Sequence, residues 1–170
     1  MAESNINNHA AFIWSVADLL RGDYKQSEYG RVILPFTVLR RLDCVIAPVK
    51  DQMLAKHQST TAAGIENYGP VLDQLTATQH LWNTSQYDLA KLLDDTDHIA
   101  SNLQAYIAGF SPQIRDILEH FDIATQIARL DKANLLYMVV GKFAEIDLHP
   151  DTVSNLEMGY LYEELIRKFS

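Results

Sequence analysis

The sequence predicts an all-α fold, a compact irregular multi-helix domain with at most one short extended piece near residues 79–85. Apolar residues recur at the three- and four-residue spacing of amphipathic helices along nearly the whole chain. No two-residue alternation lasts long enough to build a sheet. With 170 residues and 48% hydrophobic content, the chain can bury a sizeable core, so residues 1–170 are expected to form a single helical domain.

The first helix is expected to run from a cap at Asn7 or Asn8 to about Leu20. Its apolar residues recur at helical spacing, and Gly22 can adopt the left-handed conformation that ends a helix. Residues 21–30 are then expected to form an irregular, charged connection.

The second helix is expected to start near Arg31 and to be the most buried element. Pro35 fits its first turn, whereas Pro48 should kink or end it. The spacing predicts an inward arc and an opposite polar arc. The inward arc consists of Val38, Leu39, Leu42, Val45, Ile46, Val49 and Met53, and the polar arc of Thr37, Arg40, Arg41, Asp43, Cys44 and Asp51.

The rest of the chain is expected to consist of short helices and turns. Residues 57–64 are small and polar, which predicts a mobile loop, and residues 79–85 are expected to be non-helical. Capping residues and apolar spacing predict helices over residues 85–93, 95–109, 111–121, 123–130 and 132–146, a short helix capped by Asp151, and a final amphipathic helix over residues 158–169.

The net charge of -8 and pI near 5.1 argue against a free-standing nucleic-acid binder, whose affinity would depend on Lys and Arg. Residues 1–60 carry seven Lys and Arg against six acids, whereas residues 61–170 carry seven against sixteen. This asymmetry suggests that different halves of the sequence build any face near DNA or near a basic partner. The alternative is that the acidic surface only keeps the protein soluble.

The sequence predicts an intracellular, cytoplasmic protein. No apolar run approaches a membrane span, and the N-terminus lacks the features of a signal peptide. The single cysteine, Cys44, excludes an internal disulfide and is expected to be an inert thiol. The acidic run at residues 94–98 lacks the pattern of a calcium loop, and the histidines lack zinc-ligand spacing, so no metal site is expected.

One group of residues in the first third of the chain is a candidate interface. Arginine pairs with phosphate or carboxylate through its planar fork, and tyrosine provides rigid contact area. The alternative is that Arg40 and Arg41 only pair with Asp43 and neighbouring acids on a solvated face. The candidate residues are Arg21, Tyr24, Lys25, Tyr29, Arg31, Arg40 and Arg41.

Two blocks of the sequence carry a family resemblance. Residues 20–43, LRGDYKQSEYGRVILPFTVLRRLD, resemble the opening of the modification subunit of type I restriction-modification enzymes. Residues 158–169, MGYLYEELIRKF, resemble the segment that leads into the catalytic domain of those subunits, with Tyr162 where Phe is expected. The candidate interface falls within the first block.

The resemblance implies the N-terminal helical domain of a longer, S-adenosylmethionine-dependent DNA adenine-N6 methyltransferase subunit. In this chain the glycines form no Gly-x-Gly pair and the prolines form no Pro-Pro pair. The chain is therefore expected to be non-catalytic and to bind no cofactor, with S-adenosylmethionine bound by the catalytic domain outside it. The implied partners are the specificity and restriction subunits, with DNA contacted only in the assembled complex. The alternatives are a stand-alone helical adaptor or regulator and a helix-turn-helix repressor, the latter weakened by the acidic charge.

Overall fold

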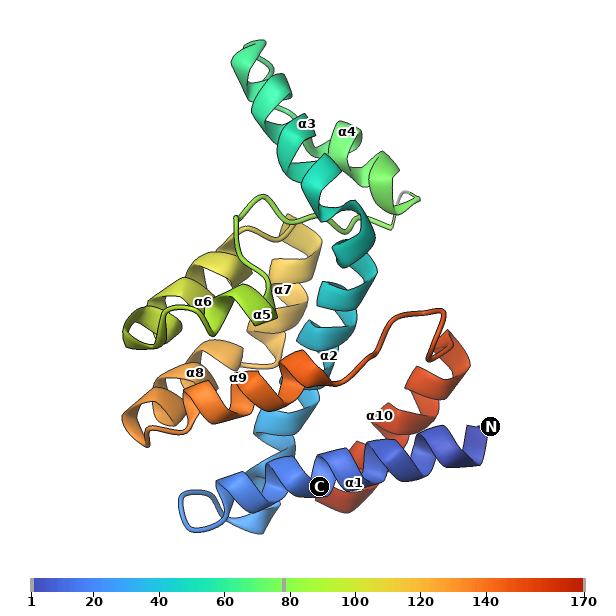
Figure 1. Ribbon diagram of the computed structural model, residues 1–170, viewed down its shortest axis with the longest axis vertical. Coiled ribbons are helices and arrows are strands. Elements are labelled where there is room, and N and C mark those ends of the chain that lie inside the picture. The colour runs from blue at the N-terminus through green and yellow to red at the C-terminus, as the bar shows by residue number, and fades with distance from the viewer. Residues whose placement is uncertain (1, 78, 170) are drawn as a thin grey trace.

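The structure is a computed structural model that describes residues 2–77 and 79–169, and within these residues it confirms the all-α prediction (Figure 1). The described residues form no sheet, only isolated bridges that pair Arg21 with Tyr24 and Asn83 with Phe110. The second bridge lies in the segment predicted to be non-helical. The α-helices are α1 (Ala2–Leu20), α2 (Tyr29–Ile46), α3 (Lys50–Ala62), α4 (Gly69–Asp73), α5 (Leu89–Leu92), α6 (Ile99–Ala108), α7 (Pro112–His120), α8 (Ile123–Lys132), α9 (Leu136–Glu145) and α10 (Asn155–Phe169).

Helix α2 lies at the centre of the fold and contacts α1, α8, α9 and α10 (Figure 1). Because it has neighbours on several sides, the prediction of one inward arc is wrong. Arg41, Asp43 and Cys44 were placed on the polar arc but are buried, whereas Val38 and Leu42 of the predicted inward arc are only partly buried. A helix with partners around its circumference has no single polar face.

The two prolines of this region behave differently from each other. Helix α2 begins at Tyr29, so Pro35 is its seventh residue and does not lie in the first turn as predicted. An interior proline removes one backbone hydrogen bond from the helix. Pro48 lies in a 3-10 turn, Ala47–Val49, that separates α2 from α3, which confirms that the helix ends there.

Helices α3 and α4 form an arm that extends from the rest of the fold (Figure 1). The predicted loop at residues 57–64 is wrong, because α3 continues to Ala62. Met53 and Thr60 are buried and lie seven residues apart, on one face of α3, so packing supports a helix that composition did not predict. Gly64, with φ of 81°, follows the end of the helix.

The connection between α1 and α2 is shorter than predicted. Helix α1 is described from Ala2, earlier than the predicted cap, and ends at Leu20 as predicted. Gly22 has a φ of 96°, which only glycine adopts readily. A 3-10 turn, Gln26–Glu28, leads directly into α2.

The later helices confirm the predicted order with shifted ends. Helix α5 covers only the end of the range 85–93, because Asp88 caps it by accepting a bond from the Lys91 amide at 2.7 Å. Helix α7 has Pro112 at its first position, as predicted. Helix α8 continues two residues past its predicted end at 130, and α9 begins at Leu136 instead of 132 because Asn134, with φ of 59°, interrupts the chain between them.

The segment between α9 and α10 contains turns at residues 150–152, so the predicted short helix at Asp151 is wrong. Ser154 and Glu157 form a capping box that starts α10 at Asn155, three residues earlier than predicted. Helix α10 packs closely on α2, where a Cβ added to Gly30 would lie 3.1 Å from Phe169 Cβ. A glycine at position 30 thus permits the close approach of these helices.

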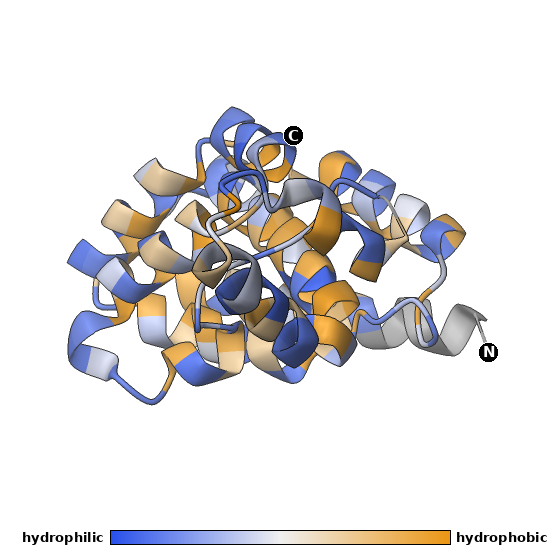
Figure 2. Cartoon of the chain, turned by 90° about the horizontal axis from the view of Figure 1, so that it is seen from above, coloured by the Kyte–Doolittle hydropathy of each residue, from blue (hydrophilic) through white to orange (hydrophobic). Residues whose placement is uncertain are grey.

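The buried apolar side chains form one cluster to which every helix from α1 to α10 contributes, including Met53 of α3 and Leu72 of α4 at the base of the arm. Most helices carry both hydrophobic and hydrophilic residues, as expected for helices with one face in a core (Figure 2). None of the helices in the described part of the chain combines the length and the apolar character that a membrane span requires.

Candidate functional site

The structure divides the seven candidate interface residues into two groups. Arg21, Lys25 and Arg31 are exposed near the connection between α1 and α2. The other four residues are buried or half-buried and contact other parts of the fold. These are Tyr24, Tyr29, Arg40 and Arg41.

The three exposed cations make only weak or local contacts. Arg21 Nη2 lies 2.9 Å from Asp18 Oδ1 in an exposed ion pair. Arg31 Nη1 lies 4.0 Å from Glu28 Oε2, and 68% of its side chain is exposed. Exposed pairs of this kind contribute little to stability, so these cations are available to a partner.

Arg129 of α8 holds the connection in place. Its guanidinium stacks 3.8 Å from the Tyr24 ring centroid, and its Nη1 lies 2.8 Å from Glu28 Oε2. Its Nη2 donates to the Asp23 carbonyl at 2.9 Å. Tyr24 also donates to Gln126 Oε1 at 3.2 Å. The exposed cations therefore project from a segment that side-chain contacts fix.

The ion pair between Glu28 and Arg129 depends on pH through the Glu28 carboxylate. The hydrogen bond from Arg129, followed by the Lys25 amide, lowers the Glu28 pKa from 4.5 to about 2. Because the folded pKa is depressed, Glu28 contributes stability above about pH 4.5, and this is lost as the pH falls toward 2. We expect Glu28→Gln to flatten the change in unfolding free energy between those pH values, as measured by urea denaturation.

The matched control for Glu28 is Glu119→Gln, at an exposed position on α7. It should leave the slope over this pH range close to that of the wild type. An equal change in slope in both variants would contradict a specific contribution from the Glu28–Arg129 contact.

Arg41 is buried and binds the segment between α9 and α10. Its Nη1 donates to the carbonyls of Leu148 at 2.8 Å and Val153 at 2.6 Å. Its Nη2 donates to Asn155 Oδ1 at 2.9 Å. Burial lowers the Arg41 pKa, but an arginine stays charged at neutral pH.

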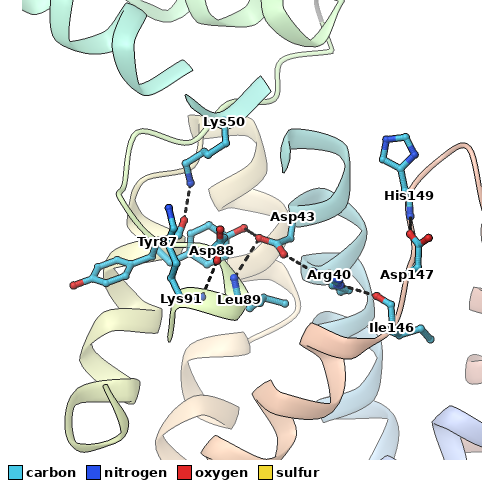
Figure 3. A network of polar contacts seen from close by, with 11 residues as sticks. Arg40, Asp43, Lys50, Tyr87, Asp88, Leu89, Lys91, Ile146, Asp147 and His149 are labelled. Carbon is cyan, nitrogen blue, oxygen red and sulfur yellow. Dashed lines mark hydrogen bonds and ion pairs between the residues drawn. The ribbon is translucent and has the colours of Figure 1, made fainter. Parts of the chain in front are cut away.

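Arg40 belongs to a polar network around Asp43 (Figure 3). Its Nη1 lies 2.7 Å from Asp43 Oδ2, and its Nε donates to the Ile146 carbonyl at 2.8 Å. Asp43 Oδ1 accepts from the Tyr106 hydroxyl at 2.6 Å and from the Leu89 amide at 3.4 Å. The network joins α2 to α5, α6 and the end of α9.

Lys50 adds a contact beside this network. Its Nζ donates to the Tyr87 carbonyl at 2.6 Å (Figure 3). The same atom lies 5.3 Å from the Tyr106 ring centroid. Sequence reasoning named Asp43 only as a partner of Arg40 and Arg41, and it did not select Tyr106, because 63 residues separate Tyr106 from Asp43 along the chain.

Because of these contacts, a mutation of Arg40 and Arg41 would affect the fold and would not test an interface alone. The expectation that both side chains project from a solvated arc is wrong, because Arg41 is buried and the Arg40 side chain is only 16% exposed. Charge reversal at both positions would place acids against backbone carbonyls and Asp43. It would disturb the fold before it tested an interface.

Cys44 and the metal-ligating side-chain types are the remaining candidates for a reactive centre in the part of the chain that the structure describes. Cys44 is buried, and burial raises its pKa, which keeps the thiol protonated and unreactive at neutral pH. The described residues contain no group of three or more His, Cys, Asp or Glu side chains that could hold a metal ion.

The fold and these contacts define an all-α domain with three exposed cations, Arg21, Lys25 and Arg31, where its first two helices meet, and we call these three residues the basic edge. A family model described as HsdM N-terminal domain matches residues 9–143. The chain belongs to this family, the N-terminal domain of the modification subunit of type I restriction-modification systems. Neither a curated protein nor a solved structure matches the chain.

The matched range contains all seven candidate interface residues and confirms the resemblance drawn from residues 20–43. It ends within α9, so the resemblance drawn from residues 158–169 stays a prediction.

Proposed function

We propose that this domain mediates assembly of a type I modification subunit with its specificity subunit and helps to close the complex around DNA. The observation that carries the proposal is the family match over residues 9–143. Methyl transfer, with S-adenosylmethionine as cofactor, belongs in this proposal to a catalytic domain outside the chain. The restriction subunit is a further partner of the assembled complex.

The basic edge supports a role at an interface. Arg21, Lys25 and Arg31 lie within eleven residues of one another along the chain, the first two on a connection that Arg129 fixes from α8 and the third in the first turn of α2. Because the contacts of Arg129 hold the backbone of this segment in place, only the side chains of these cations lose conformational freedom when they meet phosphates or carboxylates. These three residues therefore replace the full set of seven as the proposed contact.

The net charge of the domain suggests how it comes into contact with DNA. A net charge of -8 repels phosphate, so the three cations alone are too few for tight binding to a duplex. Contact with DNA then depends on the other subunits, which hold the basic edge beside the duplex. The cytoplasmic location expected from the sequence is consistent with such a complex and is part of the proposal.

The test is charge reversal of the basic edge in the full modification subunit. The variant Arg21→Glu, Lys25→Glu, Arg31→Glu should keep the wild-type melting temperature, because all three side chains are exposed. Like charges at an interface cost several kcal/mol, so binding to the specificity subunit and cognate DNA should weaken by about tenfold or more. Analytical ultracentrifugation and DNA methylation measure assembly and function.

The matched control is a second triple variant, with the same change of charge at three exposed positions outside the basic edge. Lys56, Lys91 and Arg115 are exposed on α3, α5 and α7, and their reversal to Glu should leave assembly intact. Equal assembly and methylation by the two triple variants, over a range of salt concentrations, would reject the basic edge as the contact. Such a result would favour the alternative of a helical adaptor that uses another surface.

A further inference from the structure

A groove of about 480 Å³ runs between α1 and α10. Ala10 and Ile13 of α1 and Leu161 of α10 form its apolar part. Its volume lies in the range of protein sites that bind ligands, which are about 300 to 1,000 Å³. Two helices form its walls, so its shape suits an elongated occupant.

Helix α10 exposes apolar side chains beside this groove. Its inward face carries Met158, Leu161 and Leu165, as expected for packing on α1 and α2. Leu156 is nevertheless 67% exposed, and Tyr160 is 52% exposed and lines the groove. These two residues are four positions apart and share a face of the helix. Exposed apolar residues that adjoin a groove are typical of interaction sites.

The edge of the groove is acidic. Glu157, Glu163 and Glu164 line it together with a single cation, Arg167. Arg167 and Lys168 both pair with Glu164, whereas Glu163 makes no ion pair within the described part of the chain. The remaining polar lining residue is His9, whose pKa burial lowers, so it adds no positive charge at neutral pH.

We infer that the groove between α1 and α10 binds an amphipathic helix of another polypeptide, with apolar anchors at helical spacing and a Lys or Arg opposite Glu163. The apolar part of the groove and Tyr160 would receive the anchors, as in other helix-in-groove interfaces. The unpaired carboxylate would select a basic partner through charge complementarity. The inference goes beyond the proposed function, because it requires neither DNA nor the basic edge.

The charge of the groove argues against a second copy of this chain as the occupant. In a two-fold symmetric contact the same surface meets itself, so the glutamates of one copy would lie near those of the other. Like charges placed together in this way cost several kcal/mol. A basic helix meets no such penalty.

The first experiment measures binding of labelled helical peptides to the 170-residue chain by fluorescence anisotropy. One peptide carries Leu anchors at positions i, i+4 and i+7 with flanking lysines, and the matched peptide has Glu in place of each Lys. We expect a dissociation constant on the order of 10 μM for the basic peptide and at least ~10-fold weaker binding of the acidic one. Equal affinity for both peptides, or no binding of either, would overturn the inference.

The second experiment locates the site with variants of exposed residues that should not affect folding. Tyr160→Ala should weaken binding of the basic peptide by about tenfold. Glu163→Lys should weaken binding of the basic peptide and strengthen binding of the acidic peptide. Tyr137→Ala on α9, where 45% of the residue is exposed, and Glu119→Lys on α7 are the matched controls. Circular dichroism melting confirms that each variant is folded.

Equal effects of the groove variants and their controls would place the peptide elsewhere and reject the site. Sedimentation equilibrium provides a separate check. A dimer of the chain that Tyr160→Ala dissociates would identify a second copy as the occupant and would also overturn the inference. A chain that stays monomeric while it binds the basic peptide would support it.

Discussion

Arg41→Ala is expected to lower the free energy of unfolding by about 3 to 5 kcal/mol, a large fraction of the stability of a typical domain. The Arg41 guanidinium is buried and donates to the Leu148 and Val153 carbonyls and to Asn155 Oδ1. Alanine would leave these acceptors without a charged donor and would open space beside α2. Chemical denaturation monitored by circular dichroism measures the loss.

Two variants separate the geometry of Arg41 from its charge. Arg41→Lys keeps the charge but lacks the planar fork that reaches three acceptors, so its loss should be intermediate. Arg167→Ala is the control, because the side chain of Arg167 is 74% exposed. It should change the free energy of unfolding by less than about 0.5 kcal/mol.

Hydrogen exchange gives a local readout of the same contact. In Arg41→Ala, amides of residues 146–155 should exchange faster than those of α6, because only the former depend on the guanidinium. Wild-type stability together with unchanged exchange in residues 146–155 would show that Arg41 does not hold this segment.

Helical spacing predicts much of this fold because most helices bury one face. The end of α1 at Leu20 was predictable from Gly22, and the start of α7 at Pro112 was predictable from the fixed φ of proline, because both effects are local. Helix α3 was missed because its support comes from Met53 and Thr60 packing inward and not from its small polar residues. The arc of α2 was misjudged because a pattern of spacing assumes one buried face.

The candidate site was predictable only as a list of residue types. Arg21 and Arg31 are exposed as an interface requires, but nothing local distinguishes them from Arg41, which is buried. The difference arises from Leu148 and Val153, more than 100 positions away in the sequence. Arg129 was missed for the same reason, since it reaches Glu28 across 101 residues.

Asp43→Ala is expected to destabilise the protein by about 3 to 5 kcal/mol, because it removes one partner from a buried, charged network. Asp43 accepts from Leu89 and Arg40 (Figure 3). It also accepts from Tyr106, and so connects α2 to α5 and α6. Burial, then the nearby Asp43 charge, raises the Tyr106 pKa well above its usual value, so its hydroxyl remains a donor. Alanine would leave that buried donor without its acceptor, and it would leave the Arg40 guanidinium with the Ile146 carbonyl but without its carboxylate partner.

A double-mutant cycle with Tyr106→Phe separates the hydrogen bond from the rest of the network. Tyr106→Phe keeps the packed ring and removes one donor, so it should cost about 1 to 2 kcal/mol alone. In the Asp43→Ala background it should cost much less, because the hydroxyl has already lost its acceptor. Asp43→Asn keeps the shape of the side chain but loses the charge that pairs with Arg40, so its cost should lie between those of Tyr106→Phe and Asp43→Ala. Fully additive losses for Asp43→Ala and Tyr106→Phe would mean that the two side chains do not interact, and the network would then not be what joins α2 to α6.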